Sequence, residues 1–463
     1  MNFHVVYLQV FLAIVFVAPT YQSNNNHDEY VYTDIAAEPY IHEEPIETHH
    51  IDEGITSEPY IHIDPIETHH IDEGVTEGGV ANIDPEQPHP VPHIVSISND
   101  KFSAKLYDLL RKKHQNLVFS PLSISVVMGM LSTGARGKTL KQIKKGLFFP
   151  PSHTLQTGYK NIIPGITSTK DFTIETANKV FVKKGFSILR NFQEILINSF
   201  HSNIQEMDFG NSKEAADEIN DWVEERTRDK IEDLIKPDMI NQDTSLVLVN
   251  AIYFKSNWAK KFGKTETTNF HISSYKSVEV PMMWKSDEVL YATLGSLSST
   301  MLELPYKGGR IVMQVLLPET KFGLDKLEDK LKNVDIQKLF ERENKYTEVV
   351  IGLPKFKQEN RLQLNEDLRT LGLRKMFSSR ADFSGITEGG GLHVSNVVQK
   401  AFIEVDEEGT EATAATGAVV GTESGSIGPL PPLFLADHPF VFYIRDKESG
   451  MLLFQGRVVN PLK

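Results

Sequence analysis

Residues 407–417 read Glu-Glu-Gly-Thr-Glu-Ala-Thr-Ala-Ala-Thr-Gly, the most distinctive stretch of the chain. Successive side chains of an extended segment point to opposite faces. From residue 410 onward, one alternate set is small and uncharged, and it consists of Thr410, Ala412, Ala414 and Thr416. Glu411 belongs to the opposite set, so the segment could bury one face of a strand while it leaves a charge in solvent.

The segments around this stretch predict helices first and strands later. Helices are predicted for residues 99–113 and 214–234, and for a segment that starts at Pro121 with Ser120 as its cap. Strands are predicted for residues 246–254, 301–304, 311–317, 347–353, 440–445 and 451–458. This order, without a regular alternation of strand and helix, indicates an α+β fold.

Asn250 lies inside the nearly continuous apolar strand 246–254, which indicates a strand covered on both faces. A buried amide without partners costs about 1–3 kcal/mol, so Asn250 must meet other polar groups. The candidates are His393, Ser120 and Ser123. We interpret them as a structural polar cluster, because the chain has no Gly-x-Ser-x-Gly nucleophile motif and no acid completes a triad. We therefore expect no enzymatic activity.

Seven stretches in colinear order resemble the serpin family over residues 97–463. They are 407–417 and the following: 116–124 (Asn-Leu-Val-Phe-Ser-Pro-Leu-Ser-Ile), 249–255 with Trp258 and Phe262 behind it, 353–356 (Leu-Pro-Lys-Phe), 381–385 (Ala-Asp-Phe-Ser-Gly), 438–440 (His-Pro-Phe) and 454–461. The resemblance implies three β-sheets, eight to nine helices and an exposed reactive-centre loop. It places Ser120, Ser123, Asn250 and His393 at the family's shutter, beneath the point where the main sheet parts, and Trp258 at the breach, where the loop enters.

The resemblance also implies a mechanism of suicide inhibition. A protease cuts the loop, the N-terminal half of the loop inserts into the main sheet as a new strand, and the protease is carried along as an acyl-enzyme. The hinge residues are then Glu407, Gly409, Thr410, Ala412, Ala414 and Thr416. A charge or a proline on the inserted face would stop insertion. Because the inserted set, Thr410, Ala412, Ala414 and Thr416, contains neither, the hinge is typical of an inhibitor.

The scissile bond is predicted by counting along the loop as in the family. The count from Glu407 favours Glu423–Ser424, and a count back from His438 favours Ile427–Gly428 as second choice. No Lys or Arg occurs between Thr410 and Pro439, which argues against trypsin-like targets. Elastase-like, chymotrypsin-like, glutamate-preferring and papain-like extracellular proteases remain.

The N-terminal residues have a different character. Residues 1–20 contain an apolar run followed by small residues, which predicts a signal peptide, although no Lys or Arg precedes the run. Residues 21–96 are predicted to be a disordered, acidic, His-rich extension with two copies of a 20-residue repeat. Within residues 24–95 there are 17 acidic and no basic residues, so the net charge of −14 arises there.

Three interpretations of this extension remain open. The pairs His49-His50 and His69-His70 could hold Zn²⁺ or Cu²⁺, but no spacing fixes a geometry. The acidic residues could bind a basic surface, either on the body of this chain or at a protease exosite. The extension could also be a solubilising linker without a partner.

We expect a secreted, extracellular monomer without a cofactor, a nucleic-acid partner or a membrane span. The absence of cysteine excludes disulfides and thiolate chemistry. A basic cluster at Lys138, Lys141, Lys144 and Lys145 could bind a glycosaminoglycan, or it could be a solvated helix face. Two other functions stay open: a non-inhibitory serpin acting as carrier, chaperone or storage protein, and a metal- or surface-binding protein acting through its tail.

Overall fold

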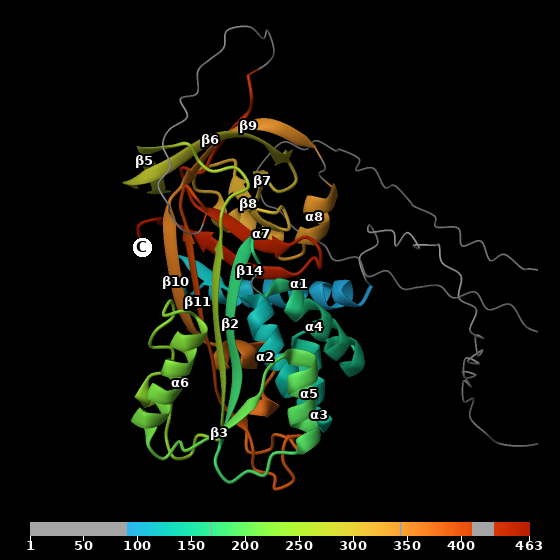
Figure 1. Ribbon diagram of the computed structural model, residues 1–463. Helices are drawn as coiled ribbons and strands as arrows, with labels where there is room; N and C mark the ends of the chain where they lie inside the picture. The colour runs from blue at the N-terminus through green and yellow to red at the C-terminus, as the bar shows by residue number, and fades with distance from the viewer. Residues whose placement is uncertain (1–89, 168, 343–344, 410–429) are drawn as a thin grey trace, which may run out of the picture. The chain divides into compact units, whose positions relative to one another are not determined.

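Two β-sheets form the framework of the fold in the computed structural model, which describes residues 90–167, 169–342, 345–409 and 430–463 (Figure 1). All of these residues belong to one compact unit, which spans residues 82–463. The nine α-helices of the described residues are α1 (Pro90–Leu110), α2 (Pro121–Gly134), α3 (Gly137–Gly146), α4 (Ser152–Ile166), α5 (Arg190–Phe200), α6 (Ser212–Arg226), α7 (Leu324–Leu331), α8 (Ile336–Arg342) and α9 (Asn365–Thr370). The α+β class predicted from the sequence is confirmed.

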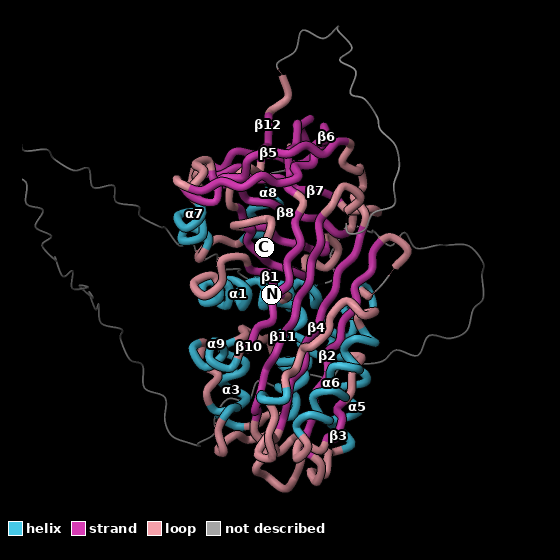
Figure 2. Tube along the Cα trace, turned by 90° about the vertical axis from the view of Figure 1, so that its left-hand side faces the viewer, coloured by secondary structure: helices cyan, strands magenta, loops and turns pink. Residues whose placement is uncertain are grey.

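The five-stranded sheet has the order β10-β11-β4-β2-β3 (Figure 2). Its strands are β10 (Phe356–Gln363), β11 (Val394–Val405), β4 (Leu246–Ser256), β2 (Phe172–Lys183) and β3 (Ile204–Met207). The central pair, β11 and β4, is parallel, whereas β10–β11 and β4–β2 are antiparallel. The sheet therefore has a parallel seam at its centre with antiparallel pairs on both sides.

The second sheet has nine strands, in the order β1-β14-β13-β8-β7-β6-β9-β12, with β5 also paired to β6. Its strands are β1 (Leu117–Phe119), β14 (Leu452–Val458), β13 (Phe440–Asp446), β8 (Ile311–Pro318), β7 (Ser299–Pro305), β6 (Lys276–Leu294), β9 (Tyr346–Pro354), β12 (Leu433–Leu435) and β5 (Lys264–Ser273). The 19-residue β6 pairs with β5 along its first part and with β7 along its last part. The resemblance implies three sheets. In this structure two of them form one continuous nine-stranded sheet, because β6 belongs to both.

Strand β4 is covered on both faces, as the apolar run predicts. Alternate residues pack into two separate core clusters: Leu246, Leu248, Ile252 and Phe254 in one, and Val247, Val249, Ala251 and Tyr253 in the other. Helix α6 covers one face of this sheet, and α2, α4 and α5 lie on the other (Figure 1). Each large apolar side chain buried in this way contributes about 1.5–3 kcal/mol, so β4 is a rigid centre for the site.

Helix α2 begins as the sequence predicts. The Ser120 hydroxyl accepts a hydrogen bond from the Ser123 N–H at 3.2 Å, and Pro121 occupies the first turn. The cap satisfies one of the N–H groups that a helix start leaves without an intrahelical partner. Because almost the whole helix is buried, this cap fixes where the chain leaves the sheet.

Two helix boundaries differ from the predictions. Helix α1 begins at Pro90 rather than near residue 99, so residues 90–96, which we assigned to the extension, are helical. Val95 packs closely on Gly158 of α4, and this contact supports the early turns. Helix α6 ends at Arg226 rather than near residue 234, because Arg228 and Asp229 adopt left-handed φ values of 53° and 58° that break the helix.

Candidate functional site

The chain leaves β11 through a tight junction, residues 406–409, that is held by the segment after β4. The Trp258 N–H donates to the Glu408 carbonyl at 2.8 Å, and the Phe262 N–H donates to the Glu407 carbonyl at 3.0 Å. The indole Nε1–H of Trp258 donates to the Asp406 carbonyl at 2.9 Å. We call residues 406–409 the hinge junction.

Gly409 closes the hinge junction in a conformation that other residues rarely adopt. Its φ is +132°, and it forms a bridge with Asn257. A Cβ atom built at this position would lie 2.2 Å from the Ser256 carbonyl oxygen. The Asp406 carboxylate accepts hydrogen bonds from the N–H groups of Glu408 and Gly409 at 2.9 and 3.0 Å. Glycine is therefore required both by the backbone and by the space available.

Trp258 fills the space beneath the hinge junction, which is where the resemblance places the breach. The indole is 2% exposed and stacks on Tyr306 with ring centroids 4.3 Å apart and an interplanar angle of 9°. Phe262 meets the indole edge-on at 5.9 Å. The Lys285 ammonium lies 4.9 Å from the Phe262 ring centroid, and burial lowers the pKa of Lys285 although Asp287 opposes this effect.

Two ion pairs fasten the glutamates of the hinge junction. The Lys355 ammonium lies 2.6 Å from the Glu407 carboxylate, which also accepts a hydrogen bond from the Thr265 hydroxyl. Glu408 pairs with Lys261. Burial alone would raise the pKa of Glu407, but the hydrogen bonds from Lys355 and Thr265 outweigh it and leave the pKa below its usual value. The junction is thus held by side chains as well as by the backbone.

A buried polar cluster lies in the middle of the five-stranded sheet and meets the start of α2. The Gln399 amide accepts from the Ser120 N–H at 3.0 Å and donates to the Ser120 carbonyl at 2.9 Å. Gln399 also donates to Asn250, which in turn donates to Asn178. The Ser123 hydroxyl donates to Asn178 at 3.4 Å. This polar cluster connects β11, β4 and β2 to α2 through hydrogen-bonded amide side chains.

Of the predicted partners of Asn250, the structure brings Ser120 and Ser123 into the polar cluster but not His393. His393 precedes β11, and its ring nitrogen Nδ1 lies 3.3 Å from the Gly391 carbonyl. Its neighbour Val394 pairs with Leu246, so His393 is about 13–17 Å along the sheet from Asn250. The prediction for His393 was wrong.

Gln399 occupies the place that we predicted for a histidine. It pairs directly with Asn250 in the parallel register, and its side chain is 0% exposed. A signal was present in the sequence: Gln399 is the one uncharged polar residue in the apolar run of residues 397–403. Sequence reasoning missed it because the parallel register between β11 and β4 cannot be read from either strand alone.

Several predicted site residues lie outside the described part of the chain. They are the hinge residues Thr410, Ala412, Ala414 and Thr416, the scissile-bond candidates Glu423, Ser424, Ile427 and Gly428, and the metal candidates His49, His50, His69 and His70. In the described ranges, no group of three or more His, Asp or Glu side chains is placed to hold a metal ion. Those ranges also contain no helix with the length and apolar character needed to cross a bilayer.

Comparison with known proteins gives a consistent family. The family model "Serpin (serine protease inhibitor)" matches residues 97–461. Antichymotrypsin-2 of Bombyx mori is 35% identical over 373 residues, which are 80% of this chain and 98% of the relative. The human leukocyte elastase inhibitor is 35% identical over 381 residues, which are 79% of this chain and 99% of the relative.

Solved structures show the same likeness. Serpin48 of the insect Tenebrio molitor, described as a highly specific serpin, superposes with a TM-score of 0.71 at 35% identity, covering 82% of this chain and all of Serpin48. The fold and the family match thus indicate a class of protease inhibitors rather than a class of enzymes. The chain belongs to the serpin family.

Proposed function

We propose that this serpin is a secreted suicide-substrate inhibitor of proteases that do not require a basic residue at the cleavage site. The observation that carries the proposal is the parallel pair β11–β4, which ends at the hinge junction. The loop begins where β11 stops, so a loop strand folding back between β11 and β4 runs opposite to both. Insertion would replace one parallel pairing by two antiparallel pairings, which are slightly more stable per residue.

The residues that would enter the sheet support inhibition. Thr410, Ala412, Ala414 and Thr416 form the alternate set that would face the helices behind the sheet. That face of the sheet carries the polar cluster and the close-packed α2, which leave room only for small, uncharged side chains. Insertion would release free energy, which would drive the transfer of the acylated protease. The uncut form would therefore be kinetically trapped in a state of higher free energy.

The target class follows from the loop sequence. The absence of Lys and Arg between Thr410 and Pro439 removes the group that a trypsin-like pocket binds. Two relatives bear names that refer to chymotrypsin and to leukocyte elastase, and these names support a target with an apolar or small specificity pocket. Glutamate-preferring proteases stay open because the preferred bond is Glu423–Ser424, and papain-like proteases stay open because the loop sequence argues only against trypsin-like ones.

The test compares two charged variants of the loop against a protease panel. The intact protein should form an SDS-stable complex with one of the proteases, and mass spectrometry of the released peptide would identify the cut bond. The variant Ala412→Glu puts a charge on the inserted face and should turn the protein into a substrate that is cut without a complex. The matched variant Thr413→Glu puts the same charge on the other face and should still inhibit.

Two outcomes would contradict the proposal. One is cleavage of the loop without a complex for every protease, which would indicate a non-inhibitory serpin. The other is equal inhibition by the variants Ala412→Glu and Thr413→Glu, which would show that the segment does not insert in this register. Cleaved and intact samples should also differ in melting temperature, because the inserted strand completes the sheet.

We further propose secretion with removal of residues 1–20, and a monomeric inhibitor. The N-terminal mass of protein recovered from culture medium tests the first point, and light scattering tests the second.

A second contact proposed for this protein is with a glycosaminoglycan. On α3, Lys138, Lys141 and Lys145 are exposed on one side of the helix, which supports such binding. Retention on heparin that falls when these lysines become glutamine would support that contact, whereas unchanged retention would exclude it.

A further inference from the structure

Acidic residues are missing from a long part of the folded chain. Residues 109–170 contain ten Lys or Arg residues and no Asp or Glu. This stretch includes the end of α1 and the whole of α2, α3 and α4. A surface with one sign of charge attracts partners of the opposite sign and speeds their encounter with the protein. The stretch therefore gives the molecule a basic surface that suits an anionic partner.

Phe148 lies in this stretch, in a backbone conformation that bulky residues rarely adopt. Its φ is 56°, and the next residue, Phe149, closes the end of α3 by donating its N–H to the Lys144 carbonyl at 2.9 Å. Glycine or asparagine is usual at this position of a helix end, because a large side chain is strained there. Phe148 is nevertheless 39% exposed, so burial in the core does not explain the strain. A strained, exposed aromatic side chain indicates a function outside the core.

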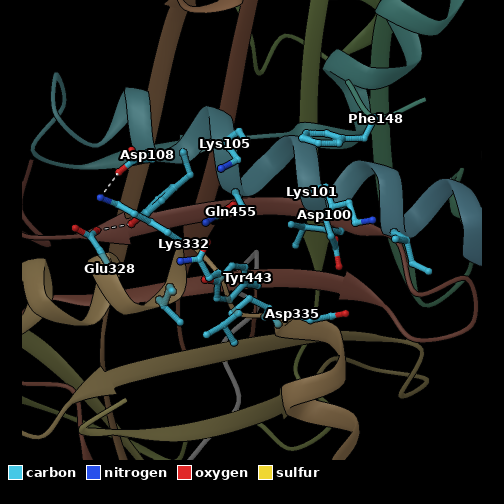
Figure 3. Close-up of a pocket in the computed structure, with 18 of the residues that line it drawn as sticks. Asp100, Lys101, Lys105, Asp108, Phe148, Glu328, Lys332, Asp335, Tyr443 and Gln455 are labelled. Atoms are coloured by element: carbon cyan, nitrogen blue, oxygen red, sulfur yellow. Dashed lines mark hydrogen bonds and ion pairs between the residues drawn. The ribbon is translucent and has the colours of Figure 1, made fainter. Parts of the chain in front are cut away.

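Phe148 belongs to a patch on one face of α1. Ile94, Ile97, Lys101 and Lys105 follow one another at spacings of three and four residues, so they share a face of this helix. Ile97, Lys101, Lys105 and Phe148 line one hollow of about 310 Å³, and Figure 3 shows the Phe148 ring over α1, along which both lysines project. Ile94 is 42% exposed. We call these five residues the α1 patch.

The lysines of the α1 patch are available to an anionic partner. Lys101 and Lys105 are exposed, and so is Lys145, three residues before Phe148. Within the described residues, none of these three lysines forms an ion pair. The patch thus combines exposed apolar side chains with positive charges that have no counter-charge in the part of the chain that the structure describes.

The carboxylates of the same hollow do not cancel these charges, because each is already paired with a basic side chain at 2.8–3.6 Å. The pairs are Asp100 with Arg445, Asp108 with Arg111, Glu328 with Arg457, and Asp335 with Lys338. An anion that approaches Lys101 and Lys105 therefore meets carboxylates whose charge is already compensated.

We propose that the α1 patch docks on an anionic phospholipid bilayer. Phe148 and Ile94 would enter the boundary between headgroups and acyl chains, while Lys101 and Lys105 would lie among the anionic headgroups. Apolar side chains flanked by lysines are typical of helices that bind this interface. The contact would be peripheral, since no helix of the described ranges has the length and apolar character to cross a bilayer.

Phe148 decides between a bilayer and a sulfated polysaccharide. Both partners are anionic and would use the lysines in the same way. A polysaccharide sulfate, however, offers no apolar region to receive an exposed phenyl ring, whereas the bilayer interface does. The proposal concerns a surface separate from the hinge junction, so it holds whether or not the protein inhibits a protease.

Vesicle flotation with the full-length protein tests the proposal, and the repulsion from its acidic extension is then included in the result. One set of vesicles contains phosphatidylcholine alone, and the other contains about 30% phosphatidylserine. We expect at least about 10-fold tighter binding to the second set. This binding should be lost in about 0.5 M salt, because the lysines contribute through charge.

Phe148→Gly separates the proposed contact from stability. Glycine removes the ring but suits the positive φ, so relief of strain offsets the lost packing and the melting temperature should stay near that of the parent. Affinity for the anionic vesicles should nevertheless fall about 3–10-fold. Phe322→Ala is the matched control, because Phe322 is 54% exposed in another part of the fold, and it should bind like the parent.

A pair of lysine variants tests the charge. Lys101→Gln with Lys105→Gln should weaken binding to the anionic vesicles by at least about 10-fold. Lys213→Gln with Lys276→Gln removes the same charge from exposed positions outside the patch and should have little effect.

Phe148→Trp reports the depth of insertion. This variant keeps an aromatic ring, so it should bind at least as well as the parent. Its additional fluorescence should be quenched by anionic vesicles with brominated acyl chains, whereas that of Phe322→Trp should not. Binding to a polysaccharide would produce no such quenching.

Four results would overturn the proposal. They are equal binding to the two sets of vesicles, unchanged affinity in Phe148→Gly, absence of quenching in Phe148→Trp, and an equal loss of affinity in the two lysine pairs. If Phe148→Gly weakened retention on heparin but left vesicle binding unchanged, the α1 patch would instead be a polysaccharide site.

Discussion

Gly409→Ala should destabilise the intact protein more than any other glycine-to-alanine change near the hinge junction. The new Cβ would lie 2.2 Å from the Ser256 carbonyl oxygen and 2.5 Å from the Cα of Asn257, both backbone atoms that cannot rotate away. The φ of +132° adds strain of about 1–3 kcal/mol for a residue with a side chain. Relief requires the junction to move away from the segment after β4, which breaks the hydrogen bonds at the Glu407 and Glu408 carbonyls.

The size of the effect can be worked from these contacts. Two lost hydrogen bonds cost about 0.5–1.5 kcal/mol each, and with the backbone strain the total is about 2–6 kcal/mol. Urea unfolding followed by tryptophan fluorescence measures it, since Trp258 lies against the junction. Gly263→Ala is the matched control, because its Cβ would meet no atom within 4 Å and its φ is ordinary. Equal midpoints for the two variants would refute the account of the hinge junction.

Three further changes test the rest of the site. Gln399→Leu leaves Asn250 with an unpaired amide oxygen and should lower the free energy of unfolding by about 1–3 kcal/mol in urea titration; an unchanged midpoint would mean that the polar cluster is not structural. The pKa of Glu407 is lowered in the folded state, so its ion pair with Lys355 stabilises the protein above the unfolded-state pKa and is lost as pH falls through the lower folded-state value. Glu407→Gln should therefore differ from the parent at pH 7 by no more than about 1 kcal/mol, because both side chains are partly exposed. The difference should shrink as the pH falls below the unfolded-state pKa, and a difference that does not shrink would contradict this. Trp258→Phe removes the donor to the Asp406 carbonyl and should raise the rate of thermal inactivation, whereas an unchanged rate would show that the indole N–H is dispensable.

The strands that the sequence predicts well are those buried on both faces. The apolar runs that became β4, β8 and β13 leave little choice of structure, and the observed strands extend the predictions by a few residues only. Strands β5 and β10 are among the strands that were not predicted. Their residues are polar and largely exposed or alternate in burial, so hydrophobic content does not mark them. Their existence depends on partners far away in the chain.

The site was predictable where one local motif fixes it, and not where two distant strands must be aligned. Ser120 caps α2 through contacts three residues apart, so its role follows from sequence alone. The choice between His393 and Gln399 depends on a register between strands about 150 residues apart, and a wrong register moves every contact. The end of α6 could not be predicted either, because the left-handed residues that end it, Arg228 and Asp229, are neither glycine nor proline.

The place of β13 and β14 in the nine-stranded sheet sets an order for biosynthesis. These two buried strands lie between β1 and β8, yet they come from residues 440–458, after every other strand of that sheet has been translated. Until those residues leave the ribosome, β1 has no neighbour in the sheet and β8 keeps one bare edge. The nascent chain therefore carries unpaired strand edges through nearly the whole of its synthesis. Such edges favour slow folding and dependence on chaperones.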